Sequence, residues 1–181
     1  LGAYLAYTLE PYLGFWGALI ISPFLTALIG IAVERVLIRP LYVRDPLYGL
    51  LLTFGLAFVI QDSVRMIWGA QGLPFKVPET LQSSLSSTLF FLTGYRVFMV
   101  ALVAIAVGAL FVILKKTRLG MRIRAGTLDL EMVSALGVDV RILRNLNFGL
   151  GIFFAGLAGV LAAGMLGLTP TIGDQLIMPS F

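Results

Sequence analysis

The sequence predicts an all-α, polytopic transmembrane helical bundle, and three observations carry that prediction. Hydrophobic residues make up 59% of the chain and charged residues only 12%, whereas soluble domains carry about 25% charged residues. Apolar segments long enough to cross a bilayer recur along the chain. The basic residues gather in the segments between them. Because so little polar surface cannot cover a soluble globule, we expect lipid to be the solvent.

Four complete spans are expected, at residues 12–33, 47–68, 97–114 and 148–168. The first has no charge and would cover about 33 Å as a helix, enough to cross the hydrocarbon core. Pro23 is expected to kink it. Residues 1–9 are too short to cross, and we expect them to finish an earlier span before a break at Glu10 and Pro11. We therefore predict that residues 1–181 form a single membrane domain that is truncated at both ends.

Small or polar side chains recur every four residues in three of the spans, which places them on one face of each helix. Such a stripe lets a neighbouring helix approach closely. The stripes comprise Gly14, Ala18, Ser22, Thr26 and Gly30, then Gly49, Thr53, Ala57 and Gln61, and finally Gly151, Ala155, Gly159, Ala163 and Gly167. A helix surrounded by lipid needs no such stripe, so the last span is expected to pack inside a bundle.

The distribution of basic residues predicts the topology. The segments 34–46 and 115–147 hold ten of the thirteen Lys and Arg residues, and the segment 69–96 holds two. Cytoplasmic loops of membrane proteins carry an excess of Lys and Arg. We therefore expect loops 34–46 and 115–147 to be cytoplasmic, and 69–96 to be an exposed outward loop with room for a short surface helix.

The segment 115–147 is the longest one that could not lie in lipid, and its polar residues predict two helical pieces. Either Thr127 or Asp129 can cap the first piece. Gly137 is a plausible stop for that helix. Asp139 can cap the next helix, which leads into the last span. We expect the two pieces to be joined at Gly137.

The same segment carries apolar residues at helical spacing. Leu128, Met132 and Leu136 recur every four residues, with Val133 beside them. An amphipathic helix of this kind needs a partner, which can be lipid, its own bundle or another protein. The pattern does not choose among the three.

The second span holds a polar group formed by Gln61, Asp62 and Arg65. Charges inside a membrane are expensive and often functional. However, Asp62 would lie about 22 Å along the helix from its start, near the outer interface. A local ion pair or a pair reaching out to water is the simpler interpretation, and a place in a substrate pathway is the alternative.

Two residue types are absent from the sequence, and their absence limits the chemistry that the chain could perform. The chain has no Cys and no His, so it offers no thiol nucleophile, no disulfide and no metal site of the usual zinc type. Its uneven charge indicates topology rather than nucleic-acid binding. A membrane enzyme is therefore disfavoured. A secondary transporter or channel would need ionisable groups or broken helices at mid-membrane.

Two runs of sequence resemble the membrane permease of branched-chain amino acid ABC importers, and the H-type subunit more than the M-type. They are TRLGMRIRAGTLDLEMVSALGVDV from Thr117 and NFGLGIFFAGLAGVLAAGMLGLTPTIG from Asn147. The first polar loop matches that family's Glu-Arg…Arg-Pro-Leu element at Glu34, Arg35, Arg39, Pro40 and Leu41. The resemblance covers nearly the whole chain and implies a multi-pass protein of a prokaryotic plasma (inner) membrane.

The resemblance implies that residues 115–147 form a cytoplasmic coupling loop, which docks on the ATPase subunits. The usual signature there is Glu-Ala-Ala, three residues and Gly. Glu131 and Gly137 have that spacing, but Met132 and Val133 replace the alanines. The ATPase-coupling residues are then expected to be Arg118, Arg122, Arg124, Glu131, Ser134 and Gly137.

The function implied is that of a permease subunit in an ATP-driven importer, most simply for branched-chain amino acids. Its partners would be ATPase subunits, a second permease subunit, an extracytoplasmic substrate-binding protein and the lipid bilayer. The chain has no P-loop, so ATP would bind the partner and this chain would need no cofactor. An ABC permease for amides, urea or sugars and an ATP-independent secondary transporter remain the alternatives.

Overall fold

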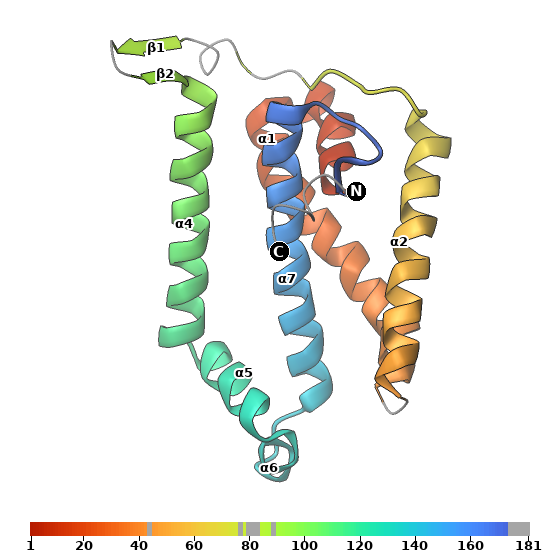
Figure 1. The fold of residues 1–181 in the computed structure, drawn as a ribbon. Helices are drawn as coiled ribbons and strands as arrows, with labels where there is room; N and C mark the ends of the chain where they lie inside the picture. Colours follow the sequence, from red (N-terminus) through yellow and green to blue (C-terminus); the bar gives the residue numbers. More distant parts are fainter. Residues whose placement is uncertain (43–44, 76–77, 79–83, 88–89, 174–181) are drawn as a thin grey trace. The chain divides into compact units, whose positions relative to one another are not determined.

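The computed structural model describes residues 1–42, 45–75, 78, 84–87 and 90–173. The chain divides into two compact units, one made of Leu1–Lys76 with Phe148–Phe181 and the other of Val77–Asn147. Within the described residues, four helical segments are long and apolar enough to cross a membrane, namely Gly2–Leu41, Leu47–Trp68, Gly94–Lys116 and Val140–Leu166. The helices in Figure 1 confirm the predicted all-α polytopic class, to which one short β-hairpin is added.

Helix α1 runs from Gly2 to Val33 and is broken once, at Gly14. The break was expected at Glu10 and Pro11, and that prediction is wrong. Gly14 has φ +68° and ψ 175°, angles that a residue with a Cβ atom rarely adopts. Pro11 and Pro23 lie inside the helix with helical backbone angles. The φ of proline is compatible with a helix, although the missing N–H removes one hydrogen bond. The kink expected at Pro23 remains a prediction.

The small-residue face of α1 packs against helix α7, which spans Val140–Leu166. Ala18 and Ser22 are fully buried, and Thr26 is nearly so. A Cβ atom on Gly156 of α7 would lie 3.1 Å from the Cβ of Thr26. Within the same stretch of α1, the ring of Phe24 lies 4.9 Å from that of Phe153 on α7. The predicted stripe of α1 is thus confirmed as a helix-packing face from Ala18 onward.

The face of α7 that packs against α1 includes residues that are not in the stripe predicted for α7. Gly149 approaches Ile31, and Ile152 fills the space over Gly30. Of the predicted stripe, Ala163 is buried and Gly159 is half-buried, whereas Gly151 and Ala155 are exposed in this chain. A packing role for Gly151 and Ala155 therefore remains a prediction.

The chain leaves α1 through two irregular turns, a π-helical turn at Glu34–Ile38 and a 3-10 turn at Arg39–Leu41. Glu34 is only 1% exposed and has an interaction partner. Helix α2, Pro46–Trp68, then begins with Asp45 as its N-cap, which accepts a hydrogen bond from the Leu47 amide at 3.0 Å. Proline suits the first helical position because its missing N–H would have no partner there.

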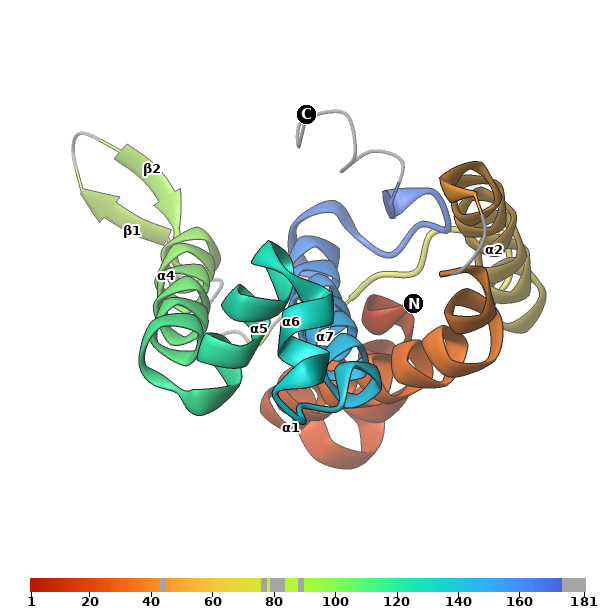
Figure 2. The same ribbon diagram turned by 90° about the horizontal axis from the view of Figure 1, so that it is seen from below.

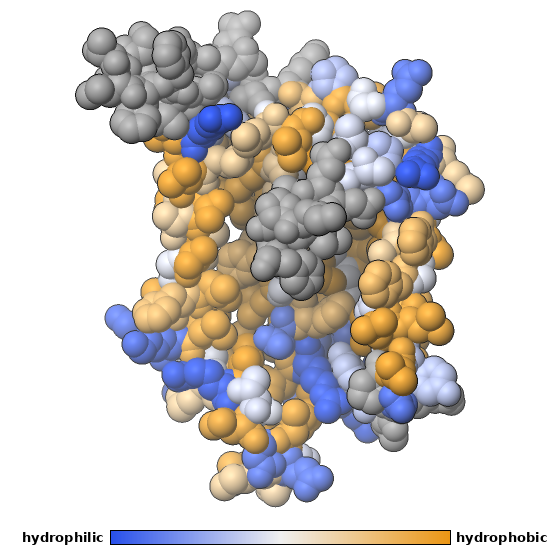
Figure 3. All heavy atoms as spheres, in the orientation of Figure 1, coloured by the Kyte–Doolittle hydropathy of each residue, from blue (hydrophilic) through white to orange (hydrophobic). Residues whose placement is uncertain are grey.

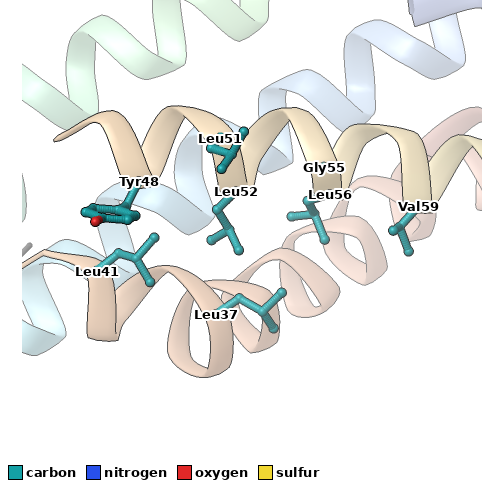
Figure 4. A pocket seen from close by; sticks show the side chains of 8 residues that line it. All are labelled: Leu37, Leu41, Tyr48, Leu51, Leu52, Gly55, Leu56 and Val59. Carbon is teal, nitrogen blue, oxygen red and sulfur yellow. The ribbon is translucent and has the colours of Figure 1, made fainter. Parts of the chain in front are cut away.

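An apolar groove separates these turns from α2 (Figure 4). It has a volume of about 520 Å³ and is lined by Leu37, Leu41, Tyr48, Leu51, Leu52, Gly55, Leu56 and Val59. Leu37 and Leu41 face the α2 side chains across it. Within the described residues that line it, the phenol of Tyr48 supplies the one polar side chain, so the groove favours apolar contents.

The end of α2 is fastened to the rest of its unit by aromatic and backbone contacts. The ring of Trp68 lies 5.4 Å from that of Tyr4. Beyond α2, Leu73 and Leu168 exchange two backbone hydrogen bonds of 2.8 and 3.0 Å. Phe75 packs at 6.0 Å from the ring of Phe15. The segments that follow α2 and α7 are thereby held together.

The second unit contains an antiparallel hairpin of β1, Ser84–Ser87, and β2, Phe90–Thr93, in which Ser84 pairs with Thr93. An exposed loop was expected there, and part of that segment lies outside the described residues. Helices α4, Gly94–Lys116, α5, Arg118–Leu128, and α6, Leu130–Ala135, follow. Figure 2 shows the hairpin leading into α4, and α5 and α6 following one another.

The surface of α4 agrees with a membrane span. Figure 3 shows hydrophobic side chains along its length and hydrophilic ones gathered at its lower end. The helix closes with Lys115 and Lys116 in its last turn, where positive charges also complement the helix dipole. The sequence alone placed this span at 97–114, slightly inside the observed bounds.

Candidate coupling surface and pathway pocket

A tight elbow joins α4 to α5 at the start of the segment 115–147. The hydroxyl of Thr117 accepts a hydrogen bond from the Gly120 amide at 3.1 Å, which caps α5. The same hydroxyl donates to the carbonyl of Ile113. A Cβ atom on Gly120 would overlap the carbonyl oxygens of Ile113 and Leu114. The elbow therefore depends on glycine and threonine at these positions.

Helix α5 was not expected from the sequence, although Thr117 was an available N-cap. It carries Arg118, Arg122 and Arg124, all exposed. Arg118 and Arg122 are four residues apart and share a helix face. The buried residues of α5 are Gly120, Ile123 and Gly126. The three arginines are thus presented to the surroundings rather than used to pack the helix.

Asp129, and not Thr127, caps α6. The Asp129 carboxylate accepts hydrogen bonds from the amides of Glu131 at 2.9 Å and Met132 at 3.0 Å. The Thr127 hydroxyl instead donates to the carbonyl of Arg124 within α5. Of the two caps considered, the structure selects the one nearest the helix, where a side-chain oxygen reaches the free amides of the first turn.

The helix α6 ends at the predicted place. Gly137 has φ +80°, the left-handed conformation that ends many helices. Its amide donates to the Ser134 carbonyl at 3.0 Å. Asp139 then accepts a hydrogen bond from the Arg141 amide at 2.8 Å and starts α7. Two helical pieces joined at Gly137 are confirmed, with α5 as an additional helix before them.

The apolar residues of this segment divide between an inner and an outer position. Val133 is 6% exposed and packs inward. Leu128, Met132 and Leu136 are 89%, 62% and 73% exposed, and we call these three side chains the apolar tip. Glu131 and Ser134 are also exposed. An apolar tip on a polar, capped segment is typical of a surface that another molecule covers.

A pocket of about 310 Å³ lies where α5 meets the start of α7. It brings together Arg122 and Gly137 of the predicted coupling residues and adds Asp139. Its remaining walls are apolar, formed by Leu119, Leu136, Val138, Ile142, Leu143 and Leu146. Arg118, Arg124, Glu131 and Ser134 do not line it. The predicted coupling residues therefore do not all line this pocket.

The predicted pathway residues do form a cluster, which we call the α2 pocket. This pocket of about 520 Å³ is lined by Phe58, Val59, Gln61, Asp62, Arg65 and Thr171. Three of these six residues were not predicted from the sequence. Phe58 and Val59 could have been found, since they lie three or four residues before Asp62 on one helical face. Thr171 follows α7, and no pattern along the chain relates it to α2.

The simpler interpretation of Asp62 and Arg65 was a local ion pair or a pair reaching out to water, and the described residues show exposed side chains without the ion pair. Both side chains are exposed and line the same pocket. Within the part of the chain that the structure describes, neither one forms an ion pair or a side-chain hydrogen bond. Gln61, in contrast, has an interaction partner. Among the described residues, no group of three or more His, Cys, Asp or Glu side chains comes together.

The family model and the relatives that match this chain all describe permease proteins of branched-chain amino acid transport systems. The model of the family described as branched-chain amino acid transport system / permease component matches residues 1–181. The high-affinity branched-chain amino acid transport system permease protein LivH of Salmonella typhimurium is 28% identical over 172 residues, 93% of this chain and 54% of LivH.

Two further relatives agree with this result. LivH of Escherichia coli K12 is 27% identical over the same coverage. BraD of Pseudomonas aeruginosa, also a permease protein of such a system, is 27% identical over 84% of this chain and 51% of BraD. The chain thus spans about half the length of these relatives. No solved structure matches it.

Proposed function

Because the chain belongs to the family of branched-chain amino acid transport system permease components, we propose that it imports branched-chain amino acids as the permease part of an ATP-driven transporter. It is a multi-pass membrane protein with four helical segments of spanning length. Its relatives are permease proteins of transport systems with this substrate class. Import would take place across the inner membrane, with loops 34–46 and 115–147 in the cytoplasm.

The apolar tip is the observation that carries the proposed mechanism. Leu128, Met132 and Leu136 are largely exposed on a segment whose basic residues predict the cytoplasm. Burying one such side chain in an interface contributes about 1.5–3 kcal/mol. We assign the tip, with the exposed Glu131 and Ser134, as the surface that docks on the cytoplasmic ATPase.

The three arginines of α5 complete this surface by charge. Arg118, Arg122 and Arg124 are exposed on α5, and the last residue of that helix, Leu128, belongs to the apolar tip. Guanidinium groups bind carboxylates in a bidentate geometry, so they would select an acidic rim on the ATPase. ATP binding there would move α6, and the closely packed face between α1 and α7 would allow the spans to shift.

The remaining partners follow from this arrangement. A second permease subunit would cover faces that are exposed in this chain, such as the one with Gly151 and Ala155. An extracytoplasmic binding protein would deliver the amino acid on the side of the segment 69–96. ATP would bind only the ATPase subunits.

A single-cysteine crosslink tests the docking surface. Ser134→Cys would be made in the full-length protein, freed of other cysteines and coexpressed with candidate ATPase subunits. We expect a specific crosslink whose yield changes when ATP binds. Gln71→Cys is the matched control, because Gln71 is also exposed but lies in the segment predicted to face outward.

A charge placed in the apolar tip tests its role in binding. Met132→Glu should abolish the Ser134→Cys crosslink and ATP-dependent leucine uptake, since a carboxylate would be buried against apolar partner atoms. The proposal fails if Ser134→Cys and its neighbours give no crosslink while uptake continues without any ATPase. That result would indicate an ATP-independent transporter.

A further inference from the structure

The α2 pocket combines two opposite charges with an apolar wall. Asp62 and Arg65 lie three residues apart on α2, which places their Cβ atoms about 5–6 Å from each other on one face. Both line the pocket, and neither is neutralised by an ion pair among the described residues. Two unpaired charges near a membrane carry a cost that a ligand with complementary charges would remove.

The apolar part of the pocket lies one helical turn away from the charges. Phe58 and Val59 precede Asp62 by four and three residues and line the same pocket. Their side chains are 68% and 62% exposed, so their surfaces are available to a ligand. The pocket therefore presents, along α2, an apolar wall, then a carboxylate, then a guanidinium.

Thr171 contributes from outside α2. It belongs to the segment after α7, which the backbone hydrogen bonds between Leu73 and Leu168 fasten within the same unit. Its hydroxyl can both donate and accept a hydrogen bond. The pocket is thus formed by two chain segments that are far apart in sequence, as small-molecule sites commonly are.

We infer that the α2 pocket is a transit site that binds the zwitterionic head group of an aliphatic amino acid. The ammonium group bonds to the Asp62 carboxylate and the carboxylate group bonds to the Arg65 guanidinium. The aliphatic side chain lies against Phe58 and Val59. This inference rests on the proposed function, because it assigns a place for the transported solute within the permease.

The order of groups along α2 explains the selectivity that such a site would have. A solute with only one charge would leave either Asp62 or Arg65 uncompensated. A solute with a polar side chain would leave hydrogen-bonding groups unsatisfied against Phe58 and Val59. The site is therefore matched to a molecule that is zwitterionic at one end and apolar at the other.

Cysteine protection provides the test. Thr171→Cys would be introduced into the full-length protein, freed of other cysteines, assembled with its partner subunits and placed in phosphatidylglycerol nanodiscs. Its reaction with a small charged thiol reagent would be followed at increasing leucine concentration. We expect leucine to slow the reaction. We expect no protection from 4-methylpentanoate, which lacks the ammonium group, or from 3-methylbutylamine, which lacks the carboxylate.

Variants of the two charged residues give the quantitative result. In Asp62→Asn and Arg65→Gln, the leucine concentration for half protection should rise about tenfold or more, as expected for a lost charge-assisted bond. Ser63→Ala is the matched control, because Ser63 lies between them but bonds to the Val59 carbonyl and does not line the pocket. Its half-protection concentration should equal that of the parent protein.

The outcomes separate this inference from the proposed function. ATP-driven leucine uptake would be measured in liposomes for every variant, including the charge variants with native Thr171. No uptake by the parent protein overturns the proposed function. Normal uptake by Asp62→Asn and Arg65→Gln, or equal protection in all variants, overturns the site alone. Protection by added phosphatidylethanolamine, without any by leucine, assigns the pocket to a lipid head group and also overturns it.

Discussion

Replacing Asp129 by alanine removes the acceptor of two hydrogen bonds, from the amides of Glu131 at 2.9 Å and Met132 at 3.0 Å. Loss of an N-cap costs about 1 kcal/mol, which is about a fivefold change in an equilibrium constant. Because α6 has only six residues, that cost falls on local opening of the helix. We expect the amides of Val133 and Leu136 to exchange about fivefold faster with solvent.

Hydrogen exchange by mass spectrometry on the full-length protein in nanodiscs would measure the change. Asp129→Asn should stay close to the parent protein, since asparagine is an equally good N-cap. Asp139→Ala is the second control, because the Asp139 carboxylate bonds to the Arg141 amide and not to α6. Equal exchange in Asp129→Ala and the parent protein, or the same acceleration in Asp139→Ala, would refute the capping argument.

Three further substitutions test the backbone and the packing. Gly156→Val should destabilise the protein by about 1–3 kcal/mol through overpacking against α1. Gly151→Ala should not destabilise it, because no atom lies within 4 Å of the new Cβ. Thermal unfolding of the two variants would show the difference. Gly120→Ala should distort the elbow and raise proteolysis between α4 and α5, whereas Gly108→Ala in open space on α4 should not. Gly137→Ala should cost about 1–2 kcal/mol because of its φ of +80°, and Gly137→Asn, a residue that tolerates this conformation, should recover much of that loss in an exchange measurement on α6.

The features that could be predicted are those that depend on residues close together in the sequence. The spans followed from long apolar runs, and the end of α6 at Gly137 followed from a glycine after a helical pattern. The packing face of α1 followed from small residues at intervals of four. In each case a local property, such as hydropathy, a cap or a small side chain, has the same effect in almost any fold.

The features that were missed depend on which of two local conformations is more stable, or on contacts between segments that are far apart in the sequence. The break in α1 was assigned to the polar pair Glu10 and Pro11, but the structure keeps both residues helical and breaks the helix at Gly14, which can adopt a positive φ. Helix α5 was overlooked because its three arginines obscure its apolar periodicity. The part that Thr171 takes in the α2 pocket required the fold, since Leu73 and Leu168 bring its segment to α2 only in three dimensions.

Helix α6 is held in place at both ends and by one buried side chain, and this affects how it would transmit motion. A helix of six residues is far below the length at which isolated helices become stable in water, about 12–15 residues. The Asp129 cap, the positive φ of Gly137 and the buried Val133 hold it in place, and none of the three belongs to the apolar tip. Apart from Gly137, which is also one of the predicted coupling residues, the residues proposed to bind the ATPase are therefore not the ones that hold α6 in place. A weakened cap would impair transmission of a movement while leaving the contact surface itself unchanged.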